Sequence, residues 1–476
     1  MFGDETSGRF DSWDHISGRP SSRISERAAV SRRTAEDVLD CVVVGAGAAG
    51  LAAAAALHEA GRTFVVLEAR ERIGGRAHTV RLSGGQAAER GAEYLHGARV
   101  ATWEYVARFG LATHLASGPT RIGVPEFRRG EWWPAGASDS DRALQGLGAA
   151  LAIPDAADVS LRDALNRAGF SGDRLRAAEG RMEVLSPIDP TVVSARSAGA
   201  AWRLVAPETA CFVLVSGYGQ LWDELSRPFA DRILLSSPVA ALDWSPAGVT
   251  AHVGGGTFEG RTAVVTLPLG VLQSGAVAFR PHLPDRKRAA IDGLRSGAIV
   301  KVIAEFRRPF WESRTGTVPS FRAPDSPFFA FRVSFWDRPG PPTLVAFLGA
   351  ASALAVTGYR ERVAELLHQA LGEMFPETDV GAELVRLEVA DWPADPWARG
   401  AVSVEPVGGA HLRAELALPT PPLFWAGEAT STDGGAECVH GALTTGRRAV
   451  LEALHLLRPA SVTDPTSRLE WARYRD

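Results

Sequence analysis

Apolar runs and turn residues along the chain predict an alternation of strands and helices. The run LDCVVV, which ends at Val44, is typical of a strand buried on both faces of a parallel sheet. An alanine-rich helix is expected over residues 48–60 and a second buried strand over 63–69. This order of strand, helix and strand predicts a βαβ unit, after which residues 98–230 are expected to be mostly helical.

The second half of the chain is richer in strand patterns. Strands separated by turn residues are expected in RILLSSPVAALDW, VTAHVGG and TAVVTLP, and again over 297–306 and 343–350. Residues 360–374 have the periodicity of an amphipathic helix. A last buried strand at 423–429 precedes a long helix at 438–457. The pattern predicts an α/β fold.

Length and composition fit a globular protein of two domains. The chain has 476 residues, 46% of them hydrophobic and 22% charged, which is ordinary. A net charge of −4 gives no broad basic surface, so nucleic acid is not an expected partner. No apolar stretch reaches about 18 residues, so no membrane span is expected. Three scattered cysteines form neither a metal signature nor a disulfide framework, which makes a reducing cytoplasm the expected location.

Both ends of the chain are polar. Residues 1–35 are rich in Ser, Arg, Asp and Glu and lack the apolar segment of a secretory signal. They predict either a flexible arm or an arm that packs on the second subunit of a homodimer. Residues 458–476 are expected to form a C-terminal tail.

The segment GAGAAG, from Gly45 to Gly50, follows a strand and opens a helix. Gly45 and Gly47 allow a tight turn and a close approach of the backbone to a pyrophosphate, and Gly50 allows close packing of helix on strand. The N–H groups at the helix N-terminus would face the phosphates. The alternative is a glycine-rich turn in some other α/β fold.

Two features after this turn favour FAD. Glu68 ends the second strand, 23 residues after Gly45, where a carboxylate can accept hydrogen bonds from ribose hydroxyls. The segment RIGGR, from Arg72 to Arg76, has two glycines that can lie against the cofactor, and it places Arg76 to pair with a phosphate. This second element changes the expected dinucleotide from NAD to FAD.

With these motifs the sequence resembles the flavin amine oxidase family, which includes monoamine oxidases, polyamine oxidases, L-amino-acid oxidases and the flavin histone demethylases. ERGAEYLHG at 89–97 is similar to the family loop beneath the flavin, in its polyamine oxidase form. SGYGQL, SSPVAAL, VVTLPLGVL, FWAGEATS and ECVHGALTTG resemble further family segments in the same order. Related desaturases and porphyrinogen oxidases share the N-terminal motifs but match the VHGA tail and Lys301 less well.

The resemblance implies a two-domain α/β flavoprotein, in which a Rossmann-like FAD-binding domain of discontinuous segments is interleaved with a substrate-binding domain. The FAD-binding domain is expected to comprise 36–97, 228–300 and 390–457, and an α+β substrate-binding domain 98–227 and 301–389. FAD is expected to be noncovalent, because Ala401 stands where monoamine oxidases have their flavin-linking cysteine. The implied FAD contacts are Gly45, Gly47, Ala48, Ala49, Gly50, Glu68, Ala69, Arg70, Gly75, Arg76, Ala92, Glu93, Tyr94, Val239, Trp392, Gly427, Glu428, Cys438, Val439 and Ala442.

Some of these contacts have a specific implied role. The backbone of Val239 meets adenine, Trp392 packs beside the flavin ring, and Glu428 hydrogen-bonds the ribityl or pyrophosphate region. The helix that begins near Cys438 points its positive end at flavin N1 and C2=O, which stabilises the anionic reduced flavin. A simple core tryptophan and a solvated or helix-capping carboxylate are the alternatives for Trp392 and Glu428.

Lys301 lies in a predicted strand, GAIVKVIAEF, that is apolar on both faces. A buried ammonium is costly, so this lysine needs a partner or a lowered pKa. By resemblance, Lys301 holds a water near flavin N5 and assists proton handling or the reaction with oxygen. The alternative is an edge-strand lysine whose ammonium reaches solvent.

The expected substrate site includes His96, Glu93 and Arg332. His96 matches a histidine of animal polyamine oxidases and is expected to bind an amine nitrogen or a polar substrate group. Glu93 is expected to pair with a cationic substrate, and Arg332, in FFAFRVSFW, to line the pocket. The alternatives are a local hydrogen bond for His96, a solvated loop carboxylate for Glu93 and cation–π packing for Arg332.

Three positions depart from well-known subgroups. The two tyrosines of the monoamine oxidase aromatic cage correspond to Val402 and Cys438, so substrate is expected to meet these two residues instead. This departure argues against simple arylalkylamines. The carboxylate-binding arginine of amino-acid oxidases corresponds to Tyr94, which disfavours α-amino acids unless Arg332 or Arg203 substitutes.

The expected activity is an FAD-dependent oxidation of a C–N bond. It is expected to resemble the activity of polyamine oxidases rather than that of monoamine oxidases, which hold the amine in an aromatic cage. A neutral amine gives a hydride from its α-carbon to flavin N5, the imine hydrolyses, and O2 is reduced to H2O2. No second dinucleotide motif for NADPH is found, so oxygen is the expected acceptor. Three alternatives stay open: a secondary-metabolism enzyme that oxidises an amide or a complex secondary amine, a C–C desaturase or isomerase, and a non-catalytic flavin-binding scaffold.

Overall fold

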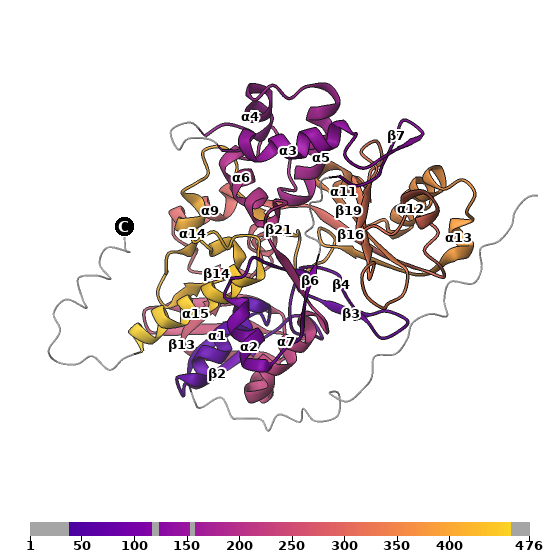
Figure 1. Ribbon diagram of the computed structural model, residues 1–476. Helices are drawn as coiled ribbons and strands as arrows, with labels where there is room; N and C mark the ends of the chain where they lie inside the picture. Colours follow the sequence, from indigo (N-terminus) through magenta and orange to yellow (C-terminus); the bar gives the residue numbers. More distant parts are fainter. Residues whose placement is uncertain (1–37, 117–122, 153–157, 458–476) are drawn as a thin grey trace, which may run out of the picture. The chain divides into compact units, whose positions relative to one another are not determined.

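The computed structural model describes residues 38–116, 123–152 and 158–457 (Figure 1). The expected arm, 1–35, and the expected tail, 458–476, lie outside the described residues. The α/β fold class predicted from the sequence is confirmed.

An eight-stranded sheet contains the predicted βαβ unit. Its strands are β1 Leu39–Val44, β2 Phe64–Leu67, β10 Ile233–Leu234, β11 Val239–Ser245, β12 Gly248–Val253, β13 Gly256–Val265, β14 Ala278–Arg280 and β22 Leu423–Trp425. The parallel part runs β10, β2, β1 and β13, and β22 also pairs with β13. β12 and β11 extend it in antiparallel order, and β14 pairs in parallel with β11.

Helices cover both faces of this sheet. Those on one face are α1 Ala48–Glu59, α2 Thr102–Phe109, α7 Gly217–Ser226, the 3-10 helix η1 Arg227–Arg232 and α15 Val439–Leu456. Those on the other are α8 Leu269–Gln273, α9 Asp285–Gly293, α14 Leu412–Ala417 and the 3-10 helix η2 Glu428–Thr430. Alternate residues of β1 pack into the cores on the two faces of the sheet. Val43 lies in the core beneath the first set of helices, and Val42 and Val44 lie in the core beneath the second set. This two-sided burial explains the uninterrupted apolar run in the sequence.

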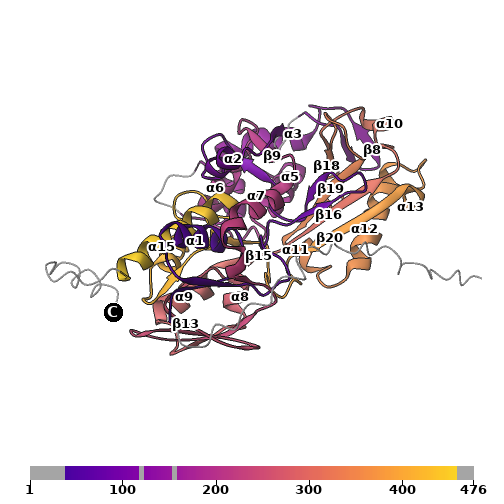
Figure 2. The same ribbon diagram turned by 90° about the horizontal axis from the view of Figure 1, so that it is seen from below.

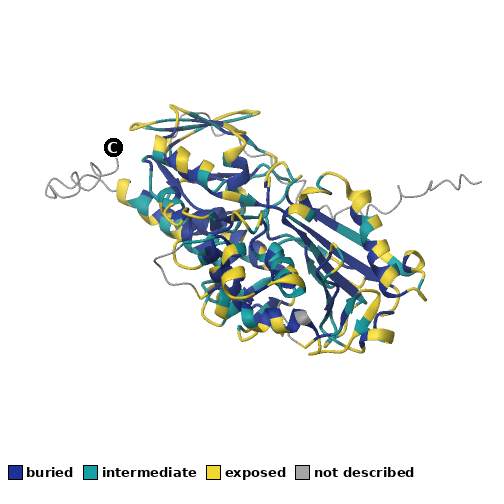
Figure 3. Ribbon diagram, turned by 90° about the horizontal axis from the view of Figure 1, so that it is seen from above, coloured by how far each residue is buried: buried dark blue, intermediate teal, exposed yellow. Residues whose placement is uncertain are grey.

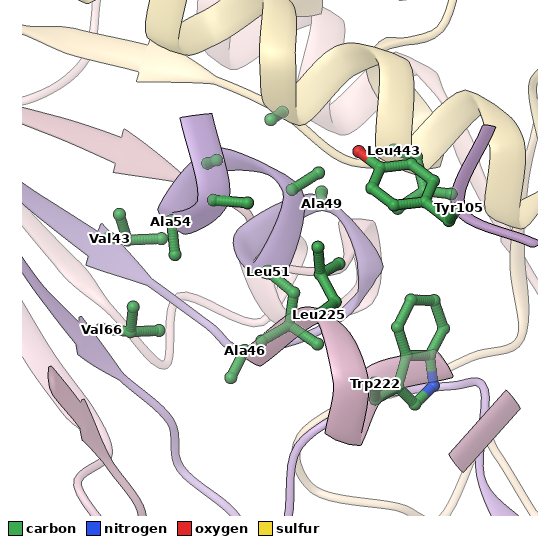
Figure 4. Close-up of a cluster of buried hydrophobic side chains, with 14 of the residues drawn as sticks. Val43, Ala46, Ala49, Leu51, Ala54, Val66, Tyr105, Trp222, Leu225 and Leu443 are labelled. Atoms are coloured by element: carbon green, nitrogen blue, oxygen red, sulfur yellow. The ribbon is translucent and has the colours of Figure 1, made fainter. Parts of the chain in front are cut away.

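Small residues let α1 and α15 lie side by side, as both views show (Figures 1 and 2). A Cβ on Gly446 would lie 2.1 Å from the carbonyl oxygen of Ala49, so the two helices touch through their backbones. Figure 4 shows Leu51 of α1 in this core with Tyr105 and Trp222 nearby. Tyr105 and Trp222 come from α2 and α7, which the sequence had placed in the substrate-binding segments. These two side chains pack in the core beside the nucleotide-binding sheet, and the domain boundaries stay a prediction.

A second sheet has seven strands in the order β20-β16-β19-β18-β17-β7-β8. Their bounds are β7 Glu126–Arg128, β8 Glu131–Trp133, β16 Ile299–Phe306, β17 Ser320–Arg322, β18 Ala330–Ser334, β19 Thr343–Gly349 and β20 Leu384–Asp391. The helices of this region are α10 Glu312–Thr315, α11 Ala350–Leu354, α12 Arg360–Met374 and α13 Val380–Glu383. The predicted helix at 360–374 is confirmed, and its Val363 and Leu367 share a core with β16.

Four further helices form a cluster of their own with a separate core. They are α3 Asp139–Ala150, α4 Leu161–Arg167, α5 Gly172–Leu185 and α6 Ala195–Val205. Seven short strands form small sheets: β3 Thr79–Arg81 with β4 Ala87–Glu89, β15 Arg295–Gly297 with β21 Val402–Val404, and β5 Tyr94–His96, β9 Cys211–Leu214 and β6 Thr113–Ala116 together. The described residues between 98 and 230 are mostly helical, as expected, and they also hold short strands that the sequence did not predict, because segments of three or four residues are too short to show a clear alternation. Figure 3 shows that the strands of the large sheets are mainly buried, whereas the outer helices expose one side.

Candidate active site

A cavity of about 350 Å³ lies beside the carboxyl ends of β1 and β2, next to β16 and α5. Its volume is typical of a site for a small molecule. It brings together most of the residues predicted from the sequence, from segments far apart in the chain. Those that line it are Gly45, Gly47, Ala48, Ala49, Glu68, Ala69, Arg70, Gly75, Arg76, Ala92, Glu93, Tyr94, His96, Val239, Lys301, Trp392, Val402, Gly427, Glu428, Cys438, Val439 and Ala442. Gly50 and Arg332 do not line it.

The glycine turn has the geometry that its motif predicts. Gly45 has a φ of +102°, a conformation that other residues rarely adopt. A Cβ on Gly50 would lie 1.8 Å from the carbonyl oxygen of Gly45, so Gly50 serves the packing of α1 on β1 rather than the cavity wall. Gly47, at the N-terminus of α1, makes an isolated bridge to Gly74 of the RIGGR segment. The two glycine-rich loops therefore meet at one edge of the cavity.

Glu68 orders the loops at the nucleotide end of the cavity. It is 6% exposed, and its Oε2 accepts the N–H of Ala46 at 2.7 Å while its Oε1 accepts the N–H of Arg70 at 2.8 Å. Each carboxylate oxygen keeps a second lone pair for a ribose hydroxyl. Arg70 is held in turn by Asp395 at 2.9 Å.

Glu428 is neither solvated nor a helix cap. It is 6% exposed, and its Oε1 accepts Arg76 at 3.0 Å while its Oε2 accepts the hydroxyl of Ser403 at 2.7 Å. Burial alone would raise its pKa, but Arg76 and Arg413 hold the pKa of Glu428 below its ordinary value. The carboxylate therefore fixes Arg76 at the wall of the cavity.

Two helices direct their N-termini at the cavity without a side-chain cap. α1 begins after Gly47 and α15 after Cys438, and neither N-cap side chain accepts a hydrogen bond. The free N–H groups and positive ends of these helices suit a pyrophosphate at α1 and the electron-rich N1 and C2=O edge of a flavin at α15. Together with the glycine cradle and Glu68, this arrangement fits FAD.

Lys301 is buried on an interior strand of the second sheet. Its strand, β16, lies between β20 and β19, and the side chain is 2% exposed, so the edge-strand alternative is wrong. Nζ donates to Glu93 Oε2 at 2.9 Å and to the carbonyl oxygen of Gly91 at 3.2 Å. Burial lowers the pKa of Lys301, and the attraction of Glu93 opposes this effect.

Glu93 bridges two cations. Its other oxygen, Oε1, accepts Arg332 at 2.5 Å, and the Arg332 guanidinium lies 5.5 Å from the ring centroid of Tyr94. Burial acts to raise the pKa of Glu93, but Arg332 and Lys301 together hold it below its ordinary value. Glu93 is thus not a solvated carboxylate. Arg332 contacts Glu93 and Tyr94 and is not part of the cavity wall, so the expectation that it lines the pocket is wrong.

His96 faces the cavity as a neutral imidazole. Burial, aided by His440, lowers the pKa of His96 to about 4. Its Nδ1 lies 3.6 Å from Sγ of Cys211 on the neighbouring strand β9. A neutral ring can donate from one nitrogen and accept at the other, which suits contact with an uncharged amine.

The aromatic cage is replaced by smaller side chains. Val402 and Cys438 both line the cavity, and their contact with substrate stays a prediction. Burial raises the pKa of Cys438, so it remains a thiol with little nucleophilic character. Trp392 also lines the cavity, is 6% exposed, and donates from Nε1 to the carbonyl oxygen of Arg90 at 3.2 Å. Trp392 therefore both packs in the protein core and lines the cavity.

The sequence analysis missed Arg181, Trp397 and Glu437, which also line the cavity. Arg181 lies on the buried face of α5 with Ala177, Ala178 and Met182, a spacing visible in the sequence as a cation on an apolar helix face. Burial raises the pKa of Glu437 to about 8. Glu437 has a positive φ of +66°. Nothing in the sequence indicates this backbone conformation, because the residue is neither glycine nor asparagine. Arg203, on α6, is exposed and does not line the cavity.

No described helix is both long enough and apolar enough to cross a membrane. In the same residues no group of three or more His, Cys, Asp or Glu side chains is arranged to hold a metal ion.

Comparisons with known proteins agree with this geometry. Residues 48–454 match the family described as flavin containing amine oxidoreductase. Polyamine oxidase 2 of Arabidopsis thaliana is 28% identical over 85% of this chain and 86% of its own length. Lysine-specific histone demethylase 2 of Homo sapiens is 27% identical over 86% of this chain, which spans only 52% of that protein.

Solved structures share the fold. A putrescine oxidase bound to putrescine superposes with a TM-score of 0.75 at 22% identity, over 88% of this chain and 99% of the other. Cyclohexylamine oxidase from Brevibacterium oxydans gives a TM-score of 0.75 at 21% identity, over 89% of this chain and 100% of the other. The chain therefore belongs to the flavin-containing amine oxidoreductase family, and it is an oxidoreductase whose cofactor is FAD.

Proposed function

We propose that the protein oxidises the C–N bond of a small amine in this cavity, with oxygen as the final acceptor. Bound FAD would serve as the hydride acceptor and would pass the electrons to O2 to give H2O2. The observation that carries the proposal is the buried Lys301 on the wall of the same cavity as the uncapped N-terminus of α15, which suits the N1 and C2=O edge of a flavin. The kinship to polyamine oxidases, of which one is 28% identical, supports the C–N bond over a C–C bond as the target.

The residues at the substrate end suit an uncharged amine. His96 lines the cavity and stays neutral near pH 7, and a neutral imidazole nitrogen can donate to or accept from an uncharged amine. Lys301 uses two of its three donors on Glu93 and Gly91, which leaves one for a water or a substrate atom. The absence of an aromatic cage at Val402 and Cys438 leaves room for a substrate other than a simple arylalkylamine.

The experiment is aerobic turnover of an amine panel by the holoenzyme, with peroxide and product both quantified. We expect one H2O2 for each carbonyl product formed. Lys301→Met should slow flavin reoxidation by O2, with its visible flavin spectrum retained as evidence of bound FAD. A product with a new C=C bond and an intact amine would overturn the proposal in favour of a desaturase. If no amine, amide or amino acid were oxidised, the non-catalytic flavin-binding scaffold would be the remaining alternative. The cytoplasmic location, the homodimer and a role in secondary metabolism stay predictions.

A further inference from the structure

Arg413 lies behind the wall of the cavity and not in it. It belongs to α14, is 4% exposed and does not line the cavity. Its Nη1 donates to the hydroxyl of Ser403 at 2.7 Å and to the carbonyl oxygen of Glu428 at 3.2 Å, and its Nε donates to Glu405 at 3.0 Å. The hydroxyl of Ser403 donates in turn to Glu428 Oε2 at 2.7 Å. Arg413 therefore holds Glu428 directly at its backbone and, through Ser403, at its carboxylate.

Glu428 is shared between Arg413 and Arg76. On the cavity side, Nη1 of Arg76 donates to Glu428 Oε1 at 3.0 Å and to the carbonyl oxygen of Ala401 at 2.6 Å. The Nε and Nη2 groups of Arg76 have no hydrogen-bond partner among the described residues, so they are available to a phosphate of FAD. Both arginines favour the ionised form of Glu428. Without Arg413, Arg76 would have to compensate Glu428 alone, and less of its positive charge would act on the phosphate.

Lys287, on α9, holds the opposite end of α14, the helix beside it (Figure 1). It is 2% exposed, and its Nζ donates to the carbonyl oxygens of Glu415 and Leu416 at 2.8 Å and of Leu418 at 2.6 Å. An ammonium has three donors, so each of them is used, and the acceptors include carbonyls that a helix leaves unpaired at its C-terminus. With six residues, α14 is too short to be stable by itself, so its position depends on contacts of this kind.

Apolar packing alone is the alternative account of how α14 is held. Leu416 of α14 lies in one core with Ala290 and Ile291 of α9, and Leu412 packs against that core. This packing buries the helix, but it does not explain an ammonium at a position where an apolar side chain would avoid the cost of burying a charge. Hydrogen bonds to carbonyl oxygens are directional, so Lys287 fixes the end of the helix more narrowly than packing does.

We propose that Lys287 and Arg413 are positioning residues of the FAD site. Lys287 fixes α14, and Arg413 on that helix holds Glu428 so that Arg76 presents its available N–H groups to the pyrophosphate. Neither Lys287 nor Arg413 lines the cavity. The proposal concerns how tightly FAD is held, so it does not depend on which bond of the substrate the enzyme oxidises.

The Kd of FAD tests the proposal without turnover. The holoenzyme is dialysed to equilibrium at a series of concentrations, and bound and free FAD are quantified. The buffer is held at pH 6, because burial lowers the pKa of Lys287 to about 7 and the ammonium must be charged. Arg413→Met should raise the Kd by roughly 10- to 100-fold, the effect of losing a hydrogen bond to a charged group. Arg413→Lys, which keeps the charge, should raise it less.

Lys287→Met removes the three donors and keeps a chain of similar length. It acts on FAD only through α14, so it should raise the Kd by about 2- to 30-fold. The double variant Lys287→Met/Arg413→Met should bind FAD no more weakly than Arg413→Met does, because Lys287 acts through Arg413. Fully additive effects of the two changes would overturn this arrangement.

Two variants control for a general loss of stability. Arg322, on β17, is a buried arginine that faces two buried carboxylates outside the cavity, so Arg322→Met matches Arg413→Met. Leu367→Ala, in the core of the second sheet, matches Lys287→Met. Both controls should lower the midpoint of chemical unfolding and leave the Kd of FAD unchanged.

An equal Kd of FAD in Arg413→Met and the wild type would overturn the proposal, and so would an equal rise in Arg413→Met and Arg322→Met. If Arg413→Met does not fold, Arg413→Lys and Lys287→Met carry the same test, and unchanged FAD binding in both would overturn the proposal. A flavin that no amine reduces would count against the proposed C–N oxidation and would leave these binding results unaffected.

Discussion

Replacing Glu93 should damage the protein more than replacing either of its two cationic partners. Glu93 accepts Lys301 at 2.9 Å with one oxygen and Arg332 at 2.5 Å with the other. Glu93→Gln has nearly the same size, but it leaves both cations buried without a counter-charge and presents an NH2 group to one of them. Lys301→Met removes one cation and leaves Glu93 paired with Arg332. Arg332→Met leaves Glu93 paired with Lys301.

The magnitudes follow from what each variant leaves uncompensated. Breaking a buried ion pair by removing one partner costs about 3–5 kcal/mol, because a charge stays buried without its partner. Glu93→Gln should lower the free energy of unfolding by about this amount. In Lys301→Met the lost hydrogen bonds are offset in part by relief from burying an ammonium, so the loss should be within about 2 kcal/mol. Arg332→Met should resemble Lys301→Met.

The assay is chemical denaturation followed by tryptophan fluorescence, with the same excess of FAD in every sample because a ligand of the native state raises apparent stability. Slopes of the transitions should agree among the variants, so that midpoints report stability. The reasoning would be refuted if Lys301→Met or Arg332→Met were as destabilising as Glu93→Gln. Such a result would mean that Glu93 does not hold the two cations together.

Three further predictions concern the cofactor site. Gly50→Ala should abolish FAD retention, because its Cβ would lie 1.8 Å from the carbonyl oxygen of Gly45; Gly254→Ala, with nothing within 4 Å, is the control that should bind normally. The pKa of Glu437 is raised from 4.5 to about 8 by burial, so its contribution to stability is complete below pH 4.5 and is lost as the pH rises to about 8. Glu437→Gln should flatten that part of the profile of unfolding midpoint against pH, and an unchanged profile would contradict this assignment. Acid precipitation should release the flavin into the supernatant, since Ala401 offers no thiol and Cys438 stays protonated; a pellet that remains yellow would contradict noncovalent binding.

The cofactor end of the cavity could be predicted from the sequence because its residues belong to short, contiguous motifs. GAGAAG and RIGGR each fix a backbone geometry locally, and Glu68 follows at a set distance. The burial of Lys301 was also predictable, because an uninterrupted apolar strand has no solvent-facing side. Strand and helix bounds differ by only a few residues; β22 ends at Trp425, before the expected 429, because Gly427 takes a φ of +124° that no strand continues.

The substrate end could not be predicted in the same way. Glu93 and Arg332 are 239 residues apart, and nothing in either segment shows that they pair. Arg332 was expected in the pocket on the strength of its aromatic neighbours, and its guanidinium contacts Glu93 and Tyr94 instead. Arg181 carried a weak signal on an apolar helix face, but only the fold brings α5 against the cavity.

The central claim is that the cavity oxidises a C–N bond by removing hydrogen from the α-carbon. The most direct test is a single turnover of the holoenzyme under nitrogen with each amine of the panel and with its α-deuterated form, followed by flavin absorbance. The account predicts that the flavin bleaches with at least one amine, that bleaching is slower with the deuterated compound, and that one carbonyl product forms for each flavin reduced. A flavin that stays oxidised with every amine, amide and amino acid, or bleaching that leaves the C–N bond intact, would contradict it.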